Sequence, residues 1–276
     1  MTKSFGARLS AAVAHHGPVC VGIDPHRELL AAWELPETPE GLEQFAEICV
    51  EAFDGLVAIV KPQVAFFESF GSAGIAVLER TVSVLRASGT LVLADAKRGD
   101  IGTTMAAYAR TWLHDESPLC SDAVTVSPYL GFGSLEPALQ LAQDNHHGVF
   151  VLAATSNPEG PQVQNAINPD GRTVSQTIVD EVAARNAGSD HLGSVGVVVG
   201  STLVSAPDLT KLNGPILMPG IGAQGGGPDD VRRLVGDALH GVLPSVSREV
   251  LREGPSVSAL RAALTKSQES FAFLNS

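Results

Sequence analysis

The segment that decides the fold covers residues 91–104 and reads Leu-Val-Leu-Ala-Asp-Ala-Lys-Arg-Gly-Asp-Ile-Gly-Thr-Thr. Its apolar first half predicts a buried strand, and the chain then becomes charged. Residues two apart on a strand project from the same face, so Asp95 and Lys97 share one side. An acid and an ammonium at a strand's exit are poorly placed for a core and well placed for chemistry. A structural ion pair is the alternative.

Seven other short runs resemble this strand, and most of them are continuously apolar. Such runs are typical of parallel strands that are covered on both faces. The eight predicted strands are Cys20–Asp24, Val57–Gln63, Leu91–Lys97, Ala123–Pro128, Val149–Ser156, Val195–Ser201, Ile216–Gly222 and Gly241–Ser247. Eight strand–helix units predict an α/β fold of the (β/α)8 class, a TIM barrel, as one domain over residues 1–276.

Helical patterns lie between several of these strands. Thr38-Pro39 offers an N-cap and a first-turn proline, and an apolar face follows. Residues 72–87 repeat the pattern and end at Gly89, and 229–239 is a third helix. The sixth and seventh strands are close in sequence, so the helix between them must be short.

Residues 157–172 depart from this rhythm, because they are rich in Pro, Asn, Gln and Gly and show no periodicity. A long loop of this kind inside a compact domain is usually a lid, a binding loop or a disordered segment. It follows the fifth strand and therefore lies on the catalytic face of a barrel. We expect a mobile lid, with a passive insertion as the alternative.

The composition excludes several classes of protein. A hydrophobic content of 44% is typical of a globular enzyme, and a net charge of −12 argues against nucleic acid or an anionic membrane as partner. No run approaches the ~20 apolar residues of a membrane span, and the N-terminal run at residues 9–14 is too short for a signal peptide. The few, widely spaced cysteines favour a cytoplasmic protein.

The cysteines and histidines indicate no metal site. Cys20, Cys49 and Cys120 are widely spaced, so we expect three reduced, partly buried thiols rather than a disulfide or zinc framework. His26 has no companion at a metal-ligand spacing. His146-His147 precedes a strand, at the wrong end of the barrel for catalysis, and is expected to be solvated.

Polar residues gather at the carboxyl ends of the strands, where parallel barrels carry their active sites. They are Asp24, Lys61, Asp95, Lys97, Ser127, Ser156, Ser201, Gln224 and Arg248. A lysine between acids stays protonated and can deliver a proton to a carbanion. Asp100 lies beyond the strand and need not face the same pocket, so it can turn away and serve a neighbouring subunit.

The second candidate site is the glycine-rich segment 218–227 between a strand and a helix. Gly220, Gly222 and Gly225 match G-x-G-x-x-G, but only one strand follows, whereas a dinucleotide-binding fold needs several. A phosphate cradle is the better interpretation, with free N–H groups at the helix start and an arginine, Arg248, from the last strand. A glycine turn that serves packing alone is the alternative.

These motifs resemble the orotidine 5′-phosphate decarboxylase family. The most specific match is Asp95-x-Lys97-x-x-Asp100-Ile101, joined by Asp24, Lys61, the Gly-Ala-Gln-Gly loop and the final Arg248. The loop after the fifth strand and the Leu-Pro-Ser-Val-Ser-Arg ending are similar to the longer bacterial subfamily. The likeness spans the strand ends of most of the barrel.

The resemblance implies a homodimer whose sites lie at the subunit interface and bind a small nucleotide. The implied charged network is Lys61, Asp95, Lys97 and Asp100, with Asp100, Ile101 and Thr104 donated by the partner. The implied substrate contacts are Asp24 and Lys61 to ribose, Ser156 and Gln224 to the pyrimidine, and Gln224, Gly225 and Arg248 toward the phosphate.

The implied reaction converts orotidine 5′-phosphate to UMP and CO2, the last step of de novo UMP synthesis, without metal or organic cofactor. Lys97 would protonate C6. Three alternatives stay open: a metal-dependent hexulose-phosphate decarboxylase or aldolase of the same superfamily, an enzyme with a Schiff-base lysine, and a non-catalytic nucleotide-binding barrel.

Overall fold

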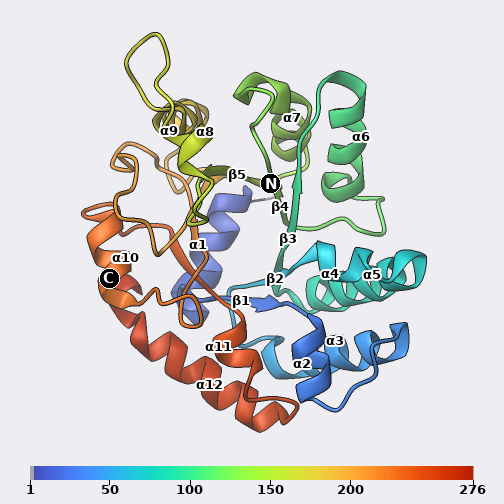
Figure 1. Cartoon of the computed structure of the whole chain (residues 1–276). Helices are drawn as coiled ribbons and strands as arrows, with labels where there is room; N and C mark the ends of the chain where they lie inside the picture. The colour runs from blue at the N-terminus through green and yellow to red at the C-terminus, as the bar shows by residue number, and fades with distance from the viewer. Residues whose placement is uncertain (1–2, 276) are drawn as a thin grey trace.

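Eight apolar segments pair in parallel and close into a barrel in which the strands follow their order in the chain. The structure is a computed structural model that describes residues 3–275, shown in Figure 1. All eight predicted strands are present, and the predicted TIM barrel is confirmed. The strands are β1 Cys20–Ile23, β2 Ile59–Pro62, β3 Leu91–Arg98, β4 Ala123–Val126, β5 Gly148–Ala154, β6 Val195–Val199, β7 Ile216–Met218 and β8 Val242–Val246.

Helices surround this barrel, and their ends follow the expected chemistry. The α-helices are α1 Phe5–His16, α2 Arg27–Ala32, α3 Pro39–Phe53, α4 Val64–Glu68, α5 Gly71–Ser88, α6 Gly102–Leu113, α7 Glu136–Asp144, α8 Pro161–Gln164, α9 Val174–Asn186, α10 Pro228–Val235, α11 Arg248–Leu251 and α12 Val257–Ser270. Two 3-10 helices, η1 Phe132–Leu135 and η2 Ala272–Asn275, complete the set. The side chain of Thr38 caps α3 by accepting the N–H of Gly41, and α5 ends at Gly89, whose φ is +96°.

Two helix predictions are wrong in detail. Residues 200–215, between β6 and β7, form turns and contain no helix, so the expected short helix is absent from this described segment. Helix α10 ends at Val235 rather than at residue 239, because Gly236 there adopts a positive φ of +51°. A glycine in this conformation ends a helix at little cost.

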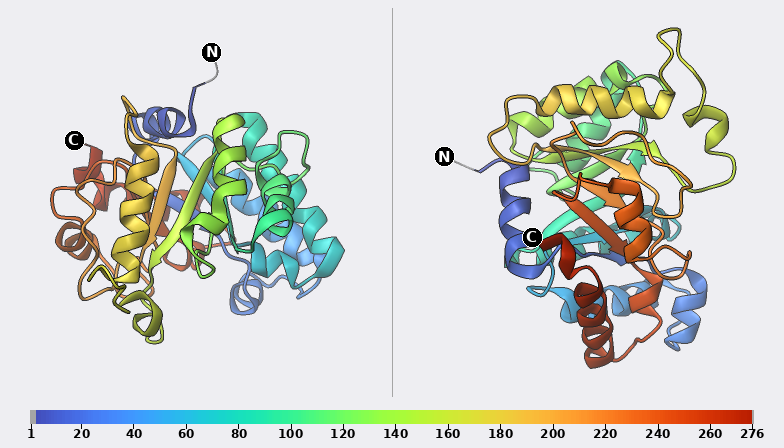
Figure 2. Two further views of the ribbon diagram at one scale, coloured as in Figure 1. Left: turned by 90° about the horizontal axis from the view of Figure 1, so that it is seen from above. Right: turned by 90° about the vertical axis from the view of Figure 1, so that its left-hand side faces the viewer.

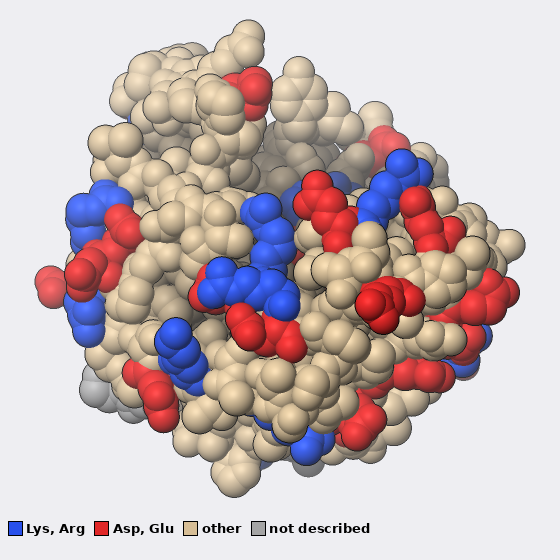
Figure 3. Space-filling model, turned by 60° about the horizontal axis from the view of Figure 1, so that its bottom comes forward, with Lys and Arg blue, Asp and Glu red and all other residues tan. Residues whose placement is uncertain are grey.

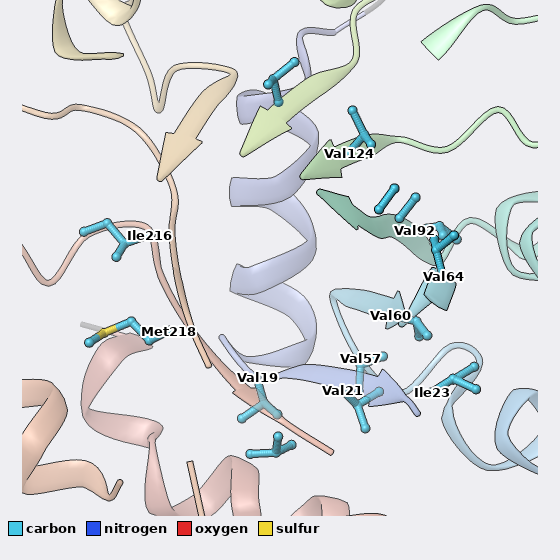
Figure 4. Packing of buried hydrophobic residues seen from close by; sticks show 14 of the residues in the cluster. Val19, Val21, Ile23, Val57, Val60, Val64, Val92, Val124, Ile216 and Met218 are labelled. Atoms are coloured by element: carbon cyan, nitrogen blue, oxygen red, sulfur yellow. The ribbon is translucent and has the colours of Figure 1, made fainter. Parts of the chain in front are cut away.

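The apolar residues of the strands form two separate cores, because neighbouring side chains point to opposite faces. Outward-facing residues such as Val21, Val60 and Val92 pack against the surrounding helices, and Figure 4 shows several of them. Inward-facing residues form the second core inside the barrel. Most strands are therefore buried on both faces, which explains their continuous apolar sequences.

Helix α1 closes the amino-terminal end of the barrel. Its residues Phe5 and Leu9 are completely buried and belong to the inner core. The Phe5 ring meets Phe150 of β5 edge-to-face, with ring centroids 6.1 Å apart. The two views in Figure 2 show α1 across this end of the barrel. The carboxyl ends of the strands are left as the open end.

The segment 157–172 is more ordered than its sequence suggested. It contains the one-turn helix α8, and Ile167 bridges Thr173. The backbone N–H of Thr155 donates to Oε1 of Gln164 at 2.9 Å, which ties α8 to the end of β5. In Figure 1 this segment projects beside the barrel mouth, next to α9, which packs against β5 and β6.

The prediction of free thiols is confirmed, and one histidine prediction is wrong. All three cysteines are free thiols and are buried. His147 is also buried, with 3% of its surface exposed, because it lies directly before β5 and not on a solvated turn. Across residues 3–275, no helix is both long and apolar enough to cross a membrane.

Candidate active site

The inner face of the barrel changes from apolar to charged along each of the first three strands. On β3 the inward positions are Leu91, Leu93, Asp95 and Lys97, and the first two belong to the inner core. On β2, Ile59 is followed by Lys61 in the same alternation. The predicted sharing of one face by Asp95 and Lys97 is confirmed, since their side chains meet at the barrel mouth.

The carboxylate of Asp95 is the centre of the site, and its two oxygens accept four hydrogen bonds. The Nζ of Lys97 donates to Oδ1 at 2.6 Å, and that of Lys61 to Oδ2 at 3.2 Å. Thr125 Oγ1 donates to Oδ1 at 2.8 Å, and Gln63 Nε2 to Oδ2 at 2.8 Å. Such a fully bonded carboxylate is held in one orientation.

The charges of this cluster stabilise one another against burial. Burial alone would raise the pKa of Asp95, but the ammonium groups of Lys61 and Lys97 outweigh it and hold that pKa well below its usual range. Burial likewise would lower the pKa of Lys61, and the carboxylates of Asp24 and Asp95 raise it instead. Asp95 is therefore ionised and Lys61 protonated at neutral pH.

Lys97 reaches the site through an unusual backbone conformation. Its φ is +47°, in a region that side-chain-bearing residues seldom adopt, and the pairing of β3 with β4 shifts register between Ala94 and Arg98. The N–H of Lys97 donates to Thr125 Oγ1 at 2.9 Å, which holds this conformation. Strained residues of this kind occur often at functional sites.

A cavity of about 200 Å³ opens beside these charges. Its walls include six of the predicted site residues, namely Asp24, Lys61, Asp95, Lys97, Gln224 and Arg248. A larger hollow of about 830 Å³ adjoins it and shares Lys97, Leu152 and Thr155 with its wall. One site thus receives residues from the ends of β1, β2 and β3 and from the segments after β7 and β8.

The open end of the barrel carries basic charge despite the acidity of the whole chain. Figure 3 shows Lys and Arg side chains together near the middle of one face, beside a hollow and bordered by acidic groups. Arg248 lines the cavity and is exposed, and among the described residues no side chain or carbonyl pairs with its guanidinium. An anionic ligand would meet a free cation there.

The glycine-rich segment lines the cavity through its loop and not through the following helix. Residues 219–221, 223 and 224 form part of the wall. The helix start differs from the predicted anion site, because Asp229 and Asp230 occupy its first turn and Asp230 accepts the N–H of Gly227 at 3.1 Å. Positive φ values at Gly220, Gly222 and Gly225 shape the loop.

Three predicted residues lie away from this cavity. The carboxylate of Asp100 accepts the N–H of Ile101 at 2.7 Å and is not part of the cavity wall. Ile101 is 61% exposed, and Thr104 is exposed on the first turn of α6. Within one copy of the chain, Asp100, Ile101 and Thr104 therefore lie outside the cavity that Lys97 lines.

Two further predicted site residues, Ser156 and Gly225, do not line the cavity, but a neighbour of each one does. Ser156 is exposed while its neighbour Thr155 lines the cavity, and Gly225 lies beside the lining residue Gln224. Sequence reasoning missed Gln63 and Thr125, both bonded to Asp95. Gln63 could have been found, because it lies two residues after Lys61.

Comparison with known proteins places this geometry in context. The family model described as Orotidine 5′-phosphate decarboxylase / HUMPS family matches residues 17–263. The chain is similar to the orotidine 5′-phosphate decarboxylase of Streptomyces coelicolor, with 59% identity over 95% of this chain and 94% of the relative. For the enzyme of the same name from Corynebacterium efficiens the identity is 56%, over 98% of both chains.

Solved structures give the same result. One from Streptomyces avermitilis, described as an orotidine 5′-phosphate decarboxylase, is 55% identical with a TM-score of 0.94, over 99% of this chain and 96% of the other. The OMP decarboxylase of Leishmania donovani is 29% identical with a TM-score of 0.76, over 99% of both chains. The similarity therefore covers nearly the whole chain.

Proposed function

The chain belongs to the orotidine 5′-phosphate decarboxylase family, and we propose that it converts orotidine 5′-phosphate to UMP and CO2 with Lys97 as the proton donor. The observation that carries the proposal is the contact between the Lys97 ammonium and the ionised Asp95 carboxylate, 2.6 Å apart at the cavity wall. The names of relatives with 56–59% identity favour this substrate over a hexulose phosphate.

The chemical step needs a donor that stays protonated until a carbanion forms. The bond between C6 and the carboxylate breaks, CO2 leaves, and the electron pair remains on C6. The Lys97 ammonium stabilises that charge and then transfers its proton to C6, and solvent reprotonates the amine. Asp95 cannot replace Lys97 as the proton donor, because the pKa of Asp95 is held far below neutrality.

Asp95 has two tasks in this proposal. It orients the ammonium of Lys97, and its negative charge lies where the substrate carboxylate would approach. Repulsion between the two carboxylates would be relieved as CO2 departs. Thr125 and Gln63 keep the Asp95 oxygens in position and so are positioning residues.

The far end of the substrate would bind at the mouth of the cavity. Arg248 offers a free guanidinium for the phosphate, and Gln224 lines the same cavity. Asp24, 3.7 Å from the Lys61 ammonium, would accept a ribose hydroxyl. Phosphate binding at a distance from C6 can contribute to the chemical step by holding the base against Lys97.

We include in the proposal a homodimer that shares its sites. The position of Asp100 outside the cavity and the exposure of Ile101 support it, because a partner subunit can supply groups that the chain's own site lacks. We also propose a cytoplasmic enzyme, supported by three free thiols, and one domain over residues 1–276.

A direct assay tests the activity. Purified protein is mixed with orotidine 5′-phosphate in excess EDTA, and the ultraviolet absorbance change of decarboxylation is followed. We expect full turnover in chelator. Activity that disappears with EDTA and returns with Mg²⁺ would instead support the metal-dependent relative, and UMP binding without turnover would support a binding protein.

Mixing two inactive variants tests the shared site. Lys97→Ala and Asp100→Ala each remove one group from every site, but a hybrid dimer has one site with both groups intact. Random exchange of subunits should restore about a quarter of the wild-type activity. A mixture as inactive as its components would show that Asp100 and Lys97 act within one subunit or that the dimer is wrong.

A further inference from the structure

Three metal-ligating side chains meet at the closed end of the barrel, opposite the active site. Asp115 and Cys120 lie in the loop between α6 and β4, and His147 directly precedes β5. One ligand atom from each lies within 4.8 Å of the other two. The decarboxylation proposed above uses none of them, because its residues lie at the carboxyl ends of the strands.

Asp115 and Cys120 both approach the same nitrogen atom, Nε2 of His147. His147 Nε2 is 3.0 Å from Asp115 Oδ1 and 3.5 Å from Cys120 Sγ. A single N–H hydrogen cannot align with both acceptors. A metal ion between the three atoms would instead accept a lone pair from each of them.

The backbone holds two of the three ligands in place without a metal. The N–H of Cys120 donates to the Ser117 carbonyl at 2.9 Å, and that of His147 to the Ala142 carbonyl at 2.8 Å. Cys120 and His147 are 2% and 3% exposed, whereas the side chain of Asp115 is 67% exposed. Two ligands are thus preorganised, and the third can adjust from the solvent side.

The local charges are compatible with a cation. A neutral imidazole is the form of histidine that binds metals. The Cys120 thiol would lose its proton to solvent as the metal–sulfur bond forms. Arg86 donates to the Cys120 carbonyl at 3.0 Å and lies 3.6 Å from the carboxylate of Asp122, which also pairs with Arg8 at 2.5 Å. The carboxylates of Asp115 and Asp122 therefore balance the two guanidinium groups near the site.

We propose that Asp115, Cys120 and His147 bind one Zn²⁺ ion per chain, with water as the fourth ligand. A thiolate and an imidazole favour zinc over the hard ions Mg²⁺ and Ca²⁺. The ion would join the α6–β4 loop to the start of β5 and so fasten the closed end of the barrel. Sequence spacing did not reveal it, because 27 positions separate Cys120 from His147.

Zinc and cobalt binding to untagged full-length protein tests the proposal. After dialysis against Zn²⁺, we expect one zinc per chain by elemental analysis. Co²⁺ in its place should give a thiolate-to-cobalt charge-transfer band and the strong visible bands of a four-coordinate ion. Decarboxylation should proceed at the same rate with and without zinc, because the site is remote from the cavity.

Substitutions at the site distinguish it from adventitious binding. Asp115→Asn changes an exposed side chain and should weaken zinc binding at least about tenfold while the protein folds normally. Cys120→Ser should abolish the charge-transfer band. The matched controls are Cys49→Ser, another buried thiol, and His146→Asn, which keeps a residue that tolerates the positive φ of +59° there. Both controls should bind zinc as the wild type does.

Each contrary result would overturn the proposal. Zinc affinity that is equal in wild type and Asp115→Asn would assign the metal to surface groups such as His15 and His16. Bound Co²⁺ without a charge-transfer band would exclude Cys120 as ligand. Retention of no zinc by the wild type would exclude the site altogether. If Cys120→Ser fails to fold, the Asp115→Asn comparison and the wild-type cobalt spectrum still decide.

Discussion

The two ends of the barrel interior are built from the same strands and differ in almost every other respect. At the closed end, Leu91 and Leu93 of β3 pack with Phe5 and Leu9 of α1. At the open end, the same strand carries Asp95 and Lys97. One strand therefore supplies apolar burial at its start and reactive charge at its finish.

This difference shows how a barrel can tolerate a costly site. Buried charges and a residue with φ of +47° are unfavourable by themselves, and each needs surroundings that enforce it. The closed end supplies that support through fully buried apolar contacts. Substitutions at the open end should therefore affect the reaction first, and substitutions at the closed end should affect stability first.

The largest effect should come from Lys97→Ala. Under the proposed mechanism the variant lacks both the proton donor and the cation beside C6, so kcat should fall by at least about 10⁴-fold. The folded state should change little, since the Lys97 side chain is 46% exposed. Single-turnover assays and urea unfolding measure the two quantities. Turnover near the wild-type rate would end the assignment of Lys97 as donor.

At the closed end, Phe5→Ala should have the opposite profile. The lost ring leaves a cavity against Phe150 and should lower the free energy of unfolding by about 3–5 kcal/mol. The kcat of the protein that remains folded should stay within about threefold of wild type, because Phe5 itself is not part of the cavity wall. A large loss of kcat at full folding would show that the two ends are coupled.

Thr125→Val should affect both properties moderately. The variant keeps the shape of a fully buried side chain but removes the donor to Asp95 and the acceptor for the Lys97 N–H. We expect a loss of about 1–3 kcal/mol in stability and about tenfold in kcat.

Thr125→Ser is the control for this prediction, because it retains the hydroxyl and should recover most of the activity. Kinetics and urea unfolding of both variants provide the comparison. A Thr125→Val enzyme with wild-type kcat would mean that the strand alone positions Lys97.

The smallest effect should appear in the acid dependence of stability. The folded-state pKa of Asp95 lies below its unfolded value of about 3.9, so its contribution is present above that pH and is lost as the pH falls through the folded-state pKa. Stability should therefore fall more steeply with acid below about pH 4 in wild type than in Asp95→Asn. Only one of 30 acidic side chains is involved, which keeps the difference small.

Unfolding in urea at several pH values from 6 down to 3 measures this difference. Parallel curves for the two proteins would contradict the inferred ionisation of Asp95.

Much of this arrangement could be predicted from local patterns. Continuous apolar runs indicated eight parallel strands because parallel barrel strands are buried on both faces. The two-residue alternation of β3 placed Asp95 and Lys97 on one side, and the same rule could have added Gln63 to Lys61 on β2. Chain order then brought β1, β2 and β3 together, so Asp24, Lys61 and Asp95 had to be neighbours.

Contacts between residues that are distant along the chain could not be predicted from local patterns. Thr125 is ordinary in sequence, and only the pairing of β3 with β4 gives its hydroxyl both Asp95 and the Lys97 N–H as partners. The exclusion of Ser156 and Asp100 from the cavity depends on how each loop leaves its strand.

The sequence by itself determined the barrel, the order of its strands and the charged segment at the end of β3, because these follow from periodicities within a few residues. Tertiary structure alone decided that Thr125 bonds to Asp95 and which residues, distant along the chain, meet at the closed end. The reason is physical: a strand's alternation is local, whereas a hydrogen bond or a metal site needs atoms that only the folded chain brings within about 3 Å.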